Sequence, residues 1–130
     1  MRLLVDTHVA IWSVLDDQKL SQRARELLSD KGCEPFVSAI SIWEIAIKHR
    51  LARRSADMPV SATEALDWLE RAGFAVLPVS AAHAVRAEQL TLPHTDPFDR
   101  MLLAQALAES MPLVTHDARL GAHGHGVIRV

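Results

Sequence analysis

The sequence contains little cysteine, little aromatic residue and little glycine. Its 130 residues include a single cysteine, Cys33, no tyrosine, five glycines and only 5% aromatic residues in all. A lone cysteine excludes an internal disulfide and a metal site of the C-x-x-C type. We therefore expect a reduced, cytoplasmic protein that is held together by a hydrophobic core rather than by cross-links.

Long hydrophobic runs and a strong charge imbalance are also absent. No apolar run approaches the roughly 18–20 residues of a membrane helix, and the short run between Arg2 and Asp6 does not read as a signal peptide. We expect no association with membranes. The net charge of −2 does not indicate a generally basic nucleic-acid-binding protein. An anionic partner would have to be held by a local basic patch or through a metal ion.

Hydrophobic residues make up 49% of the chain, and its length fits one domain, 1–130. Short apolar runs alternate with patterns typical of helices. Strands are expected at 3–5, 36–37, 74–79, 113–115 and 127–130, and helices at 7–15, 21–30, 39–51, 61–73, 80–89 and 96–109. This alternation predicts an α/β domain with a parallel sheet between helices.

Four carboxylates stand in apolar surroundings: Asp6, Glu44, Asp99 and Asp117. Asp6 and Asp117 follow the carboxyl ends of predicted strands, the edge where open parallel sheets bind ligands. Burying an isolated carboxylate costs several kcal/mol unless a partner compensates its charge. Four converging oxygen ligands without thiolates suit Mg²⁺ or Mn²⁺. The set points to metal-assisted phosphodiester chemistry.

Each acid also has a structural explanation when it is taken alone. Asp6 could cap the helix after it, and Asp117 could be a turn residue. Glu44 could close a capping box with Ser41, and Asp99 could support the start of its helix. Only the four acids together favour a metal site.

Four segments carry a resemblance to a known family. They are "LLVDTHVAIW" at 3–12, "VSAISIWEIAIK" at 37–48, "HTDPFDRMLLAQA" at 94–106 and "LVTHD" at 113–117. Together, and in this order, they resemble the PIN-domain ribonucleases, specifically the VapC-type toxins of type II toxin–antitoxin pairs. The resemblance spans nearly the whole chain.

The resemblance implies a three-layer α/β/α fold with an acidic pocket that binds Mg²⁺ or Mn²⁺. Asp6, Glu44, Asp99 and Asp117 match the family's acidic quartet, which supplies the metal ligands and catalytic groups. The implied activity is endoribonuclease cleavage of RNA phosphodiester bonds by a metal-activated water. The implied partner is a cognate antitoxin protein that blocks the pocket. We also expect a homodimer, in which apolar helix faces of two copies pack together.

Three further residues are expected to play accessory roles. Thr7 and Thr115 match the hydroxyl positions beside the first and last acids of the family, where they could hydrogen-bond a carboxylate or a metal-bound water. Asp96 lies one helical turn before Asp99. Because Pro97 follows it, Asp96 is more typical of a helix N-cap than of a metal ligand.

A basic segment follows the predicted helix that carries Glu44. It could contact RNA phosphates, or it could be a solvated helix end where cations are favoured by the helix dipole. The candidate RNA-binding residues are Lys48, Arg50, Arg53 and Arg54.

Histidines and tryptophans offer weaker signals. His8 and His116 flank two of the acids and could assist proton transfer, although local hydrogen bonding is the simpler interpretation. Trp12, Trp43 and Trp68 fall on predicted helices at core-like spacing, which favours packing over base stacking.

Two other classes of function stay open. One is an aspartyl-phosphate phosphotransfer or receiver-like domain that uses Asp6, although Asp6-Thr7-His8 lacks the second acid of an Asp-x-Asp motif and no lysine follows a late strand. The other is a non-catalytic module that binds a partner. Substitution of Asp6 or Asp99 by Asn distinguishes these from the nuclease.

Overall fold

The computed structural model describes residues 1–51, 58–91 and 96–130. Its strands are β1 (Arg2–Val5), β2 (Glu34–Ser38), β3 (Ala75–Leu77), β4 (Leu113–Thr115) and β5 (Val127–Arg129). Its helices are α1 (Thr7–Leu15), α2 (Gln22–Ser29), α3 (Ala39–Leu51), α4 (Ala62–Arg71), α5 (Ala81–Gln89), α6 (Pro97–Ala108) and α7 (Ala118–Gly121). The strands form one sheet in the order β3-β2-β1-β4-β5, and all the paired strands are parallel.

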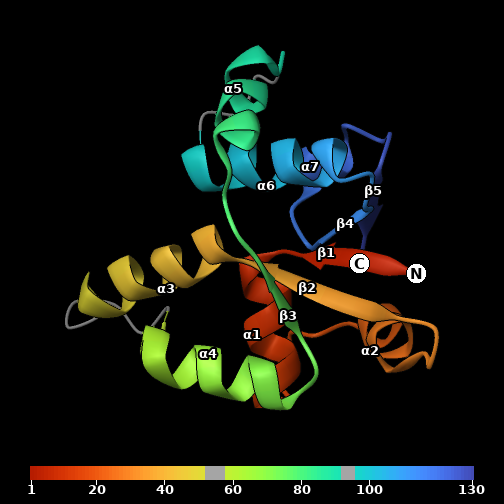
Figure 1. Ribbon diagram of the computed structural model, residues 1–130. Coiled ribbons are helices and arrows are strands. Elements are labelled where there is room, and N and C mark those ends of the chain that lie inside the picture. Colours follow the sequence, from red (N-terminus) through yellow and green to blue (C-terminus); the bar gives the residue numbers. More distant parts are fainter. Residues whose placement is uncertain (52–57, 92–95) are drawn as a thin grey trace.

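Helices cover both faces of this sheet, as Figure 1 shows. Successive residues of β1 point to opposite faces. Leu3 and Val5 belong to a buried cluster that includes residues of α1, α2 and α4. Leu4 belongs to a second cluster formed with residues of α6, β4 and α7. The chain therefore has the three-layer α/β/α architecture that was predicted.

The order of the strands creates a switch point between β1 and β4. The chain leaves β1 toward β2 and β3, then crosses the sheet to reach β4 and β5 on the other side. The loops that follow β1 and β4 therefore diverge toward opposite layers, and a crevice opens at the carboxyl ends of the strands. Asp6 directly follows β1, and Asp117 comes shortly after β4.

Most predicted elements lie where the local signals put them. The capping box of Ser61 and Glu64 is present at the start of α4, and Asp96 caps α6 with Pro97 in its first turn. The strand expected at 74–79 is shorter, Ala75–Leu77, because Pro78 cannot donate to a ladder. Helix α7 was not predicted.

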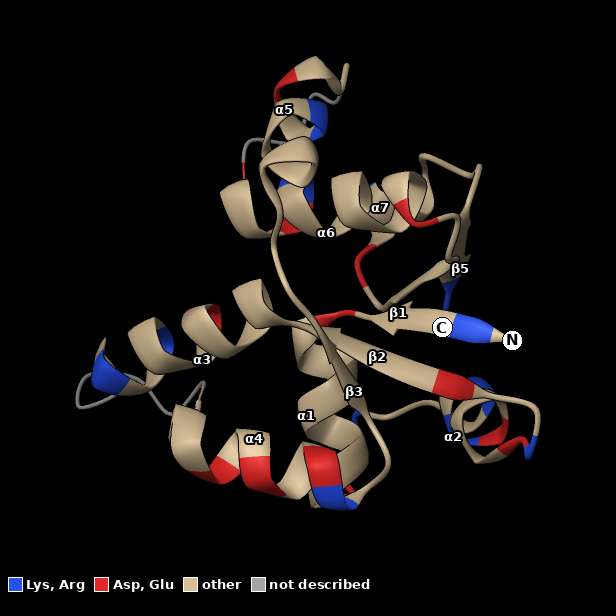
Figure 2. Ribbon diagram, viewed as in Figure 1, with Lys and Arg blue, Asp and Glu red and all other residues tan. Residues whose placement is uncertain are grey.

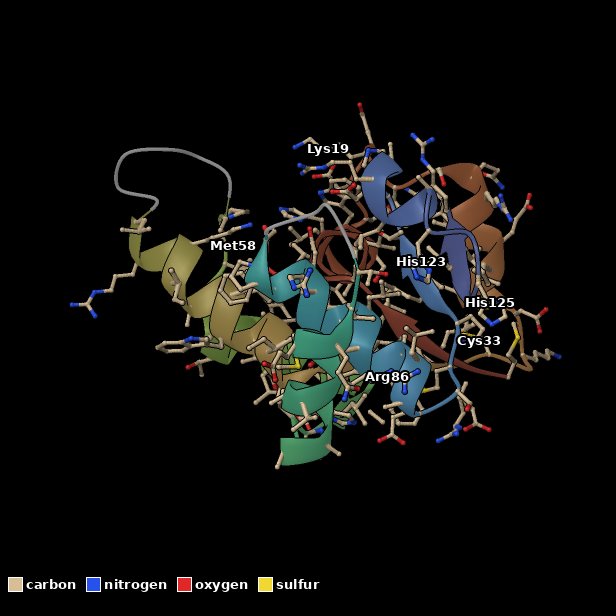
Figure 3. All side chains as sticks on the ribbon, turned by 90° about the horizontal axis from the view of Figure 1, so that it is seen from above. Lys19, Cys33, Met58, Arg86, His123 and His125 are labelled. Atoms are coloured by element: carbon tan, nitrogen blue, oxygen red, sulfur yellow. The ribbon has the colours of Figure 1, made fainter. Side chains whose placement is uncertain are left out.

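None of the described helices is long and apolar enough to cross a membrane. Viewed from above, Met58 lies at the end of the molecule where α3 ends, and His123 and His125 lie beside β5 at the other end (Figure 3).

A buried polar cluster joins the sheet to the layer of α5 and α6. Gln105 is completely buried on α6. Its side-chain oxygen accepts a hydrogen bond from the hydroxyl of Ser38, at the end of β2. Its Nε2 lies 3.2 Å from the carbonyl oxygen of Pro78 and 3.3 Å from Nδ1 of His83. The amide therefore ties together three segments that are far apart in the sequence.

His83 extends this cluster to the start of α5. Its Nδ1 accepts a hydrogen bond of 3.0 Å from the backbone N–H of Ser80, the N-cap of the helix. Its Nε2 lies 2.9 Å from Oε1 of Glu109. Because Nδ1 accepts from a backbone N–H, the proton of a neutral ring resides on Nε2 and is donated to Glu109. We refer to Ser38, His83, Gln105 and Glu109 as the Gln105 network.

Candidate metal-dependent active site

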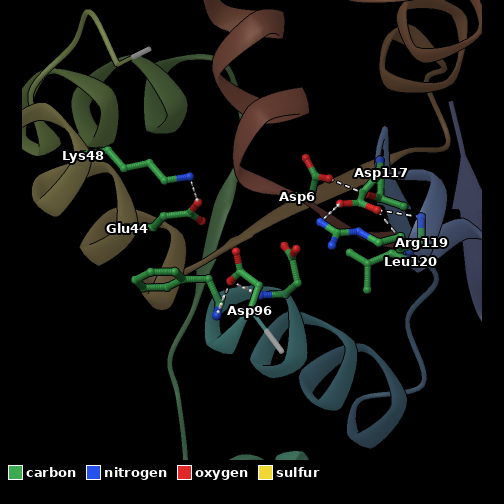
Figure 4. Close-up of polar contacts among 10 residues, drawn as sticks. Asp6, Glu44, Lys48, Asp96, Asp117, Arg119 and Leu120 are labelled. Atoms are coloured by element: carbon green, nitrogen blue, oxygen red, sulfur yellow. Dashed lines mark hydrogen bonds and ion pairs between the residues drawn. The ribbon is translucent and has the colours of Figure 1, made fainter. Parts of the chain in front are cut away.

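All four predicted acids line one cleft of about 820 Å³ at the carboxyl ends of the strands. Figure 4 shows Glu44, Asp96, Asp6 and Asp117 around a common space, which they approach from α3, α6, the β1–α1 junction and the β4–α7 junction. Figure 2 shows acidic segments at each of these places on the ribbon. Residues far apart in the sequence therefore come together at the switch point of the sheet.

Asp6 is held tightly at the base of the cleft and is only 7% exposed. Its Oδ1 accepts a hydrogen bond of 3.0 Å from the backbone N–H of Val9 and so caps α1. Its Oδ2 accepts from the hydroxyl of Thr115. Burial raises the pKa of Asp6, and the bond from Thr115 opposes that shift only in part. Asp6 is therefore a helix cap and also a carboxylate whose charge is poorly compensated.

Thr115 connects the first and last acids of the set. Its hydroxyl is completely buried and donates to Asp6, while its Oγ1 accepts a hydrogen bond of 3.0 Å from the backbone N–H of Asp117. Asp117 caps α7, because its Oδ1 accepts from the backbone N–H of Arg119 at 2.7 Å. The turn expected at Asp117 is thus the start of a short helix.

Glu44 is buried at 4% exposure and lies between a hydroxyl and an ammonium group. Thr7 Oγ1 lies 2.7 Å from Glu44 Oε1 and 2.8 Å from Ser41 Oγ. Lys48 Nζ lies 2.6 Å from the other carboxylate oxygen, Oε2. The capping box of Ser41 and Glu44 considered from sequence is wrong, because both residues lie inside α3 and Ser38 precedes the helix.

The two acids at the start of α6 have different roles. Asp96 caps the helix, since its Oδ1 accepts from the backbone N–H of Phe98 at 2.8 Å and that of Asp99 at 3.3 Å. The N-cap interpretation of Asp96 is therefore confirmed. Asp99 is half-buried in the first turn of α6 and lines the cleft. Asp96 lines the same cleft one turn earlier.

Three cations share the cleft with these acids: Lys19, Lys48 and Arg119. Arg119 Nη2 lies 3.7 Å from Asp117 Oδ2. Sequence reasoning missed Lys19 and Arg119. A signal for Arg119 was its place two residues after Asp117, whereas Lys19 reaches the cleft from the loop after α1, which the sequence pattern did not indicate.

Of the other predicted RNA-binding residues, Arg50 is the one that the structure describes, and it is not part of the cleft lining. Arg50 is exposed near the end of α3, and it carries no described contact with the acids. Arg53 and Arg54 lie outside the described residues. Of the four basic residues considered, Lys48 is the one placed beside a predicted metal ligand.

The donor set fits a hard divalent cation. Among the residues that the structure describes, five carboxylates and three cationic side chains line the cleft, so the acids outnumber the cations there. In the same residues no three His, Cys, Asp or Glu side chains lie close enough together to hold a metal ion as they stand. Carboxylates repel one another without a counter-charge, and Lys48 occupies one oxygen of Glu44. The oxygen donors therefore suit Mg²⁺ or Mn²⁺ and would draw closer around one.

The tryptophans only partly follow the sequence prediction. Trp43 is 60% exposed and Trp68 is 36% exposed, so the packing role predicted for them is wrong for Trp43 and incomplete for Trp68. Trp12 packs against the core cluster of Leu3 and Val5 and also lines the cleft. Helical spacing indicates one face of a helix, but it does not reveal whether another element covers that face.

Comparisons with known proteins show the family of the chain. Residues 3–125 match the PIN domain family. The chain is 34% identical over 126 residues to Ribonuclease VapC22 of Mycobacterium tuberculosis, covering 95% of this chain and 92% of that protein.

Solved structures share the fold at lower sequence identity. A chain of VapBC2 from Rickettsia felis, bound to a DNA fragment from its promoter, has a TM-score of 0.65 and 16% identity over 100% of this chain and 98% of its own. A toxin–antitoxin complex from Klebsiella pneumoniae contains a chain with a TM-score of 0.64 and 20% identity, covering 97% of this chain and 95% of its own.

Proposed function

Because this chain belongs to the PIN-domain family, and within it to the VapC ribonucleases, we propose that it is a toxin that cleaves RNA phosphodiester bonds with Mg²⁺ or Mn²⁺. The observation that carries this proposal is the cleft in which Asp6, Glu44, Asp99 and Asp117 meet. We take residues 1–130 as one PIN domain and place the protein in the cytoplasm.

The four acids would hold the divalent cation through their carboxylate oxygens. A bound ion of this kind lowers the pKa of a coordinated water and offsets negative charge on a phosphate. Thr115 fixes the orientation of Asp6, and Thr7 fixes that of Glu44, so both hydroxyls act on ligands rather than on RNA. The backbone N–H of Val9 prevents Asp6 from rotating.

Lys48 would interact with the RNA substrate as well as with the carboxylate of Glu44. Its ammonium lies 2.6 Å from Glu44 and compensates this buried carboxylate when no metal ion does so. The Lys48 side chain is 36% exposed, so its flexible stem can turn toward the cleft opening. With Glu44 compensated by a bound divalent cation, the Lys48 ammonium would be available to a phosphate of the RNA.

The decisive experiment compares Asp99→Asn with the matched control Asp67→Asn, which alters an exposed acid on α4. End-labelled single-stranded RNA is incubated with metal-stripped protein, with and without added Mg²⁺ or Mn²⁺. We expect metal-dependent cleavage by the parent and the control, and a loss of more than about 100-fold for Asp99→Asn, since even residues that only support metal ligands change activity 10–100-fold. Undiminished cleavage by Asp99→Asn contradicts the proposal.

The same proteins test the other two classes of function. Stable labelling of Asp6 by a phosphate donor, without RNA cleavage, would favour phosphotransfer. Absence of both activities from the folded parent protein would favour a module that only binds a partner. Growth inhibition on expression, lost in Asp99→Asn but kept in Asp67→Asn, would support the toxin role.

We further propose two protein partners. One is a cognate antitoxin, as the toxin–antitoxin complexes among the related structures suggest. The other is a second copy of this chain, packed on the face of α3 where Trp43 and Leu51 are 60% and 64% exposed. Sedimentation of the parent and of Trp43→Gln tests the pairing, because a monomer at high concentration in both proteins would contradict it.

A further inference from the structure

Three aromatic rings form one wall of the cleft beside the acids. Trp12 lies between His8 and His116. Its ring centroid is 5.9 Å from that of His8, with the planes tilted by 49°, and 5.1 Å from that of His116, in an edge-to-face arrangement of 75°. All three rings line the cleft. We call these residues the aromatic wall.

The aromatic wall is fixed to the same backbone segments as two of the acids. His8 lies two residues after Asp6, and His116 directly precedes Asp117. Trp12 stands one helical turn after His8 on α1, and its inner side packs against the buried core. Its position relative to Asp6 is therefore set by a rigid helix rather than by a loop.

The ring nitrogens of the aromatic wall have no hydrogen-bond partner within residues 1–51, 58–91 and 96–130. The local hydrogen bonding expected for His8 and His116 is therefore not found at their rings, although the backbone N–H of His116 hydrogen-bonds the carboxylate of Asp6. Aromatic rings that line an otherwise charged cleft, with unused polar edges, offer a stacking face together with hydrogen-bonding groups.

A nucleotide has the complementary pair of features, because one sugar joins an anionic phosphate to a flat aromatic base. We propose that the aromatic wall binds the nucleobase adjacent to the phosphate held at the carboxylates, with Trp12 as its principal stacking surface. This inference rests on the proposed ribonuclease function and assigns it a base-binding subsite. A base can stack there only if it is unpaired, so the subsite favours single-stranded RNA.

The first test is a double-mutant cycle on binding. The parent and Trp12→Leu are titrated with an end-labelled single-stranded nonaribonucleotide, with Ca²⁺ in place of Mg²⁺ to prevent cleavage. In a second set of oligonucleotides one base is removed, at each position in turn. Base stacking on aromatic side chains contributes about 1–3 kcal/mol per base, which corresponds to roughly 5- to 150-fold in affinity.

The parent should lose affinity in this range when one particular base is removed, and Trp12→Leu should lose much less at the same position. A purely structural role of Trp12 would weaken all oligonucleotides equally and leave the effect of base removal unchanged. That result would overturn the inference. The control Trp68→Leu should behave like the parent, because Trp68 does not line the cleft.

The second test does not require a change of Trp12. In the double variant Trp43→Phe/Trp68→Phe, Trp12 is the only tryptophan of the chain. Its fluorescence should be quenched when the intact oligonucleotide binds, and much less by the oligonucleotide that lacks the critical base. If this variant cleaves RNA with Mg²⁺ but shows no quenching, the base subsite is wrong and the ribonuclease proposal stands. If it neither cleaves nor binds RNA while the parent also fails to cleave, the ribonuclease proposal fails as well.

Discussion

The Gln105 network and the acidic cleft are both polar clusters that adjoin the sheet, and they differ in how completely their groups are compensated. In the Gln105 network the amide oxygen, the amide nitrogen and both ring nitrogens of His83 have partners. Among the described residues of the cleft, five carboxylates face three cations, and Asp6 has a raised pKa because burial removes water from it. The groups of the first cluster are compensated within the chain, whereas the second has an excess of acids over cations in the residues described and is the place where we propose a bound cation.

This difference separates structural from functional polar groups. A satisfied network stabilises the contacts between elements, and it loses stability when a member is removed. A cluster of like charges costs stability, and it persists where a ligand supplies the missing charge. Substitutions in the two clusters should therefore have opposite consequences: loss of stability in the Gln105 network, and loss of activity in the cleft.

The largest effect on stability is expected for Gln105→Leu. The apolar side chain would leave the buried hydroxyl of Ser38 without its acceptor, which costs about 1–3 kcal/mol, whereas the carbonyl of Pro78 belongs to an exposed residue and can turn to water. We expect the free energy of unfolding in urea to fall by about 1–3 kcal/mol, with RNA cleavage retained by the folded protein. Gln22→Leu, on the exposed side of α2, is the matched control. Equal stability of the two variants would contradict the comparison.

A smaller effect, and one on activity, is expected for Thr7→Val. Valine has nearly the same shape but removes the hydroxyl that holds Glu44. We expect cleavage measured as kcat/KM to fall about 10- to 100-fold, as is typical when a group that orients a metal ligand is lost. Thr63→Val on the exposed face of α4 should leave kcat/KM unchanged. Full activity of Thr7→Val would place Glu44 outside the metal site.

The smallest effect is expected for Lys48→Gln, which should strengthen the binding of Mn²⁺ and weaken the binding of RNA. Loss of the cation beside Glu44 makes the cleft more negative, so Mn²⁺ should bind more tightly. RNA should bind more weakly, and the slope of log affinity against log salt should decrease by about 0.7, the value for one phosphate contact with a single strand. Lys31→Gln, an exposed residue after α2, provides the control. Changes of the same sign in both affinities would contradict the dual role of Lys48.

The sequence alone predicted the features of the fold that depend on interactions between neighbouring residues. The Asp96-Pro97 start of α6 and the Ser61 capping box are interactions within a few residues, and both were predicted. The four acids line one cleft, and two of them, Asp6 and Asp117, do so because strand ends of a parallel sheet meet at one edge. The short α7 escaped prediction because four residues give no periodic pattern, and its cap at Asp117 is also typical of a turn.

What could not be predicted depends on which elements face each other. Lys19 enters the cleft because the loop after α1 returns toward it, and no spacing in the sequence indicates that return. Trp43 and Trp12 have similar helical environments in the sequence, yet one is exposed and the other stands in the cleft. One hydrogen bond of the Gln105 network joins residues 67 positions apart, so the network could be found only in the folded chain.

The stability of the folded protein should depend on pH through Asp6, and the direction of this dependence follows from its pKa. Burial raises its pKa in the folded protein above the ordinary value of an aspartate. The folded state therefore binds the proton of Asp6 more tightly than the unfolded state does. The stabilisation that this proton provides is fully present below the unfolded pKa, and it is lost as the pH rises through the raised pKa of the folded state. The variant Asp6→Asn has no carboxyl group to titrate, so it does not lose stability in this way. Its amide oxygen can still cap α1. At neutral pH without metal, the variant should therefore be at least as stable as the parent.

The most direct test is the midpoint of thermal unfolding, measured at neutral pH against Mn²⁺ concentration for the parent, Asp6→Asn and the control Asp67→Asn. We predict that Mn²⁺ raises the midpoint of the parent and of the control, because the ion binds the folded cleft and not the unfolded chain. We predict that Asp6→Asn starts at or above the parent and responds little to Mn²⁺. An unresponsive parent, or an equal response of all three proteins, would contradict a metal site built on Asp6.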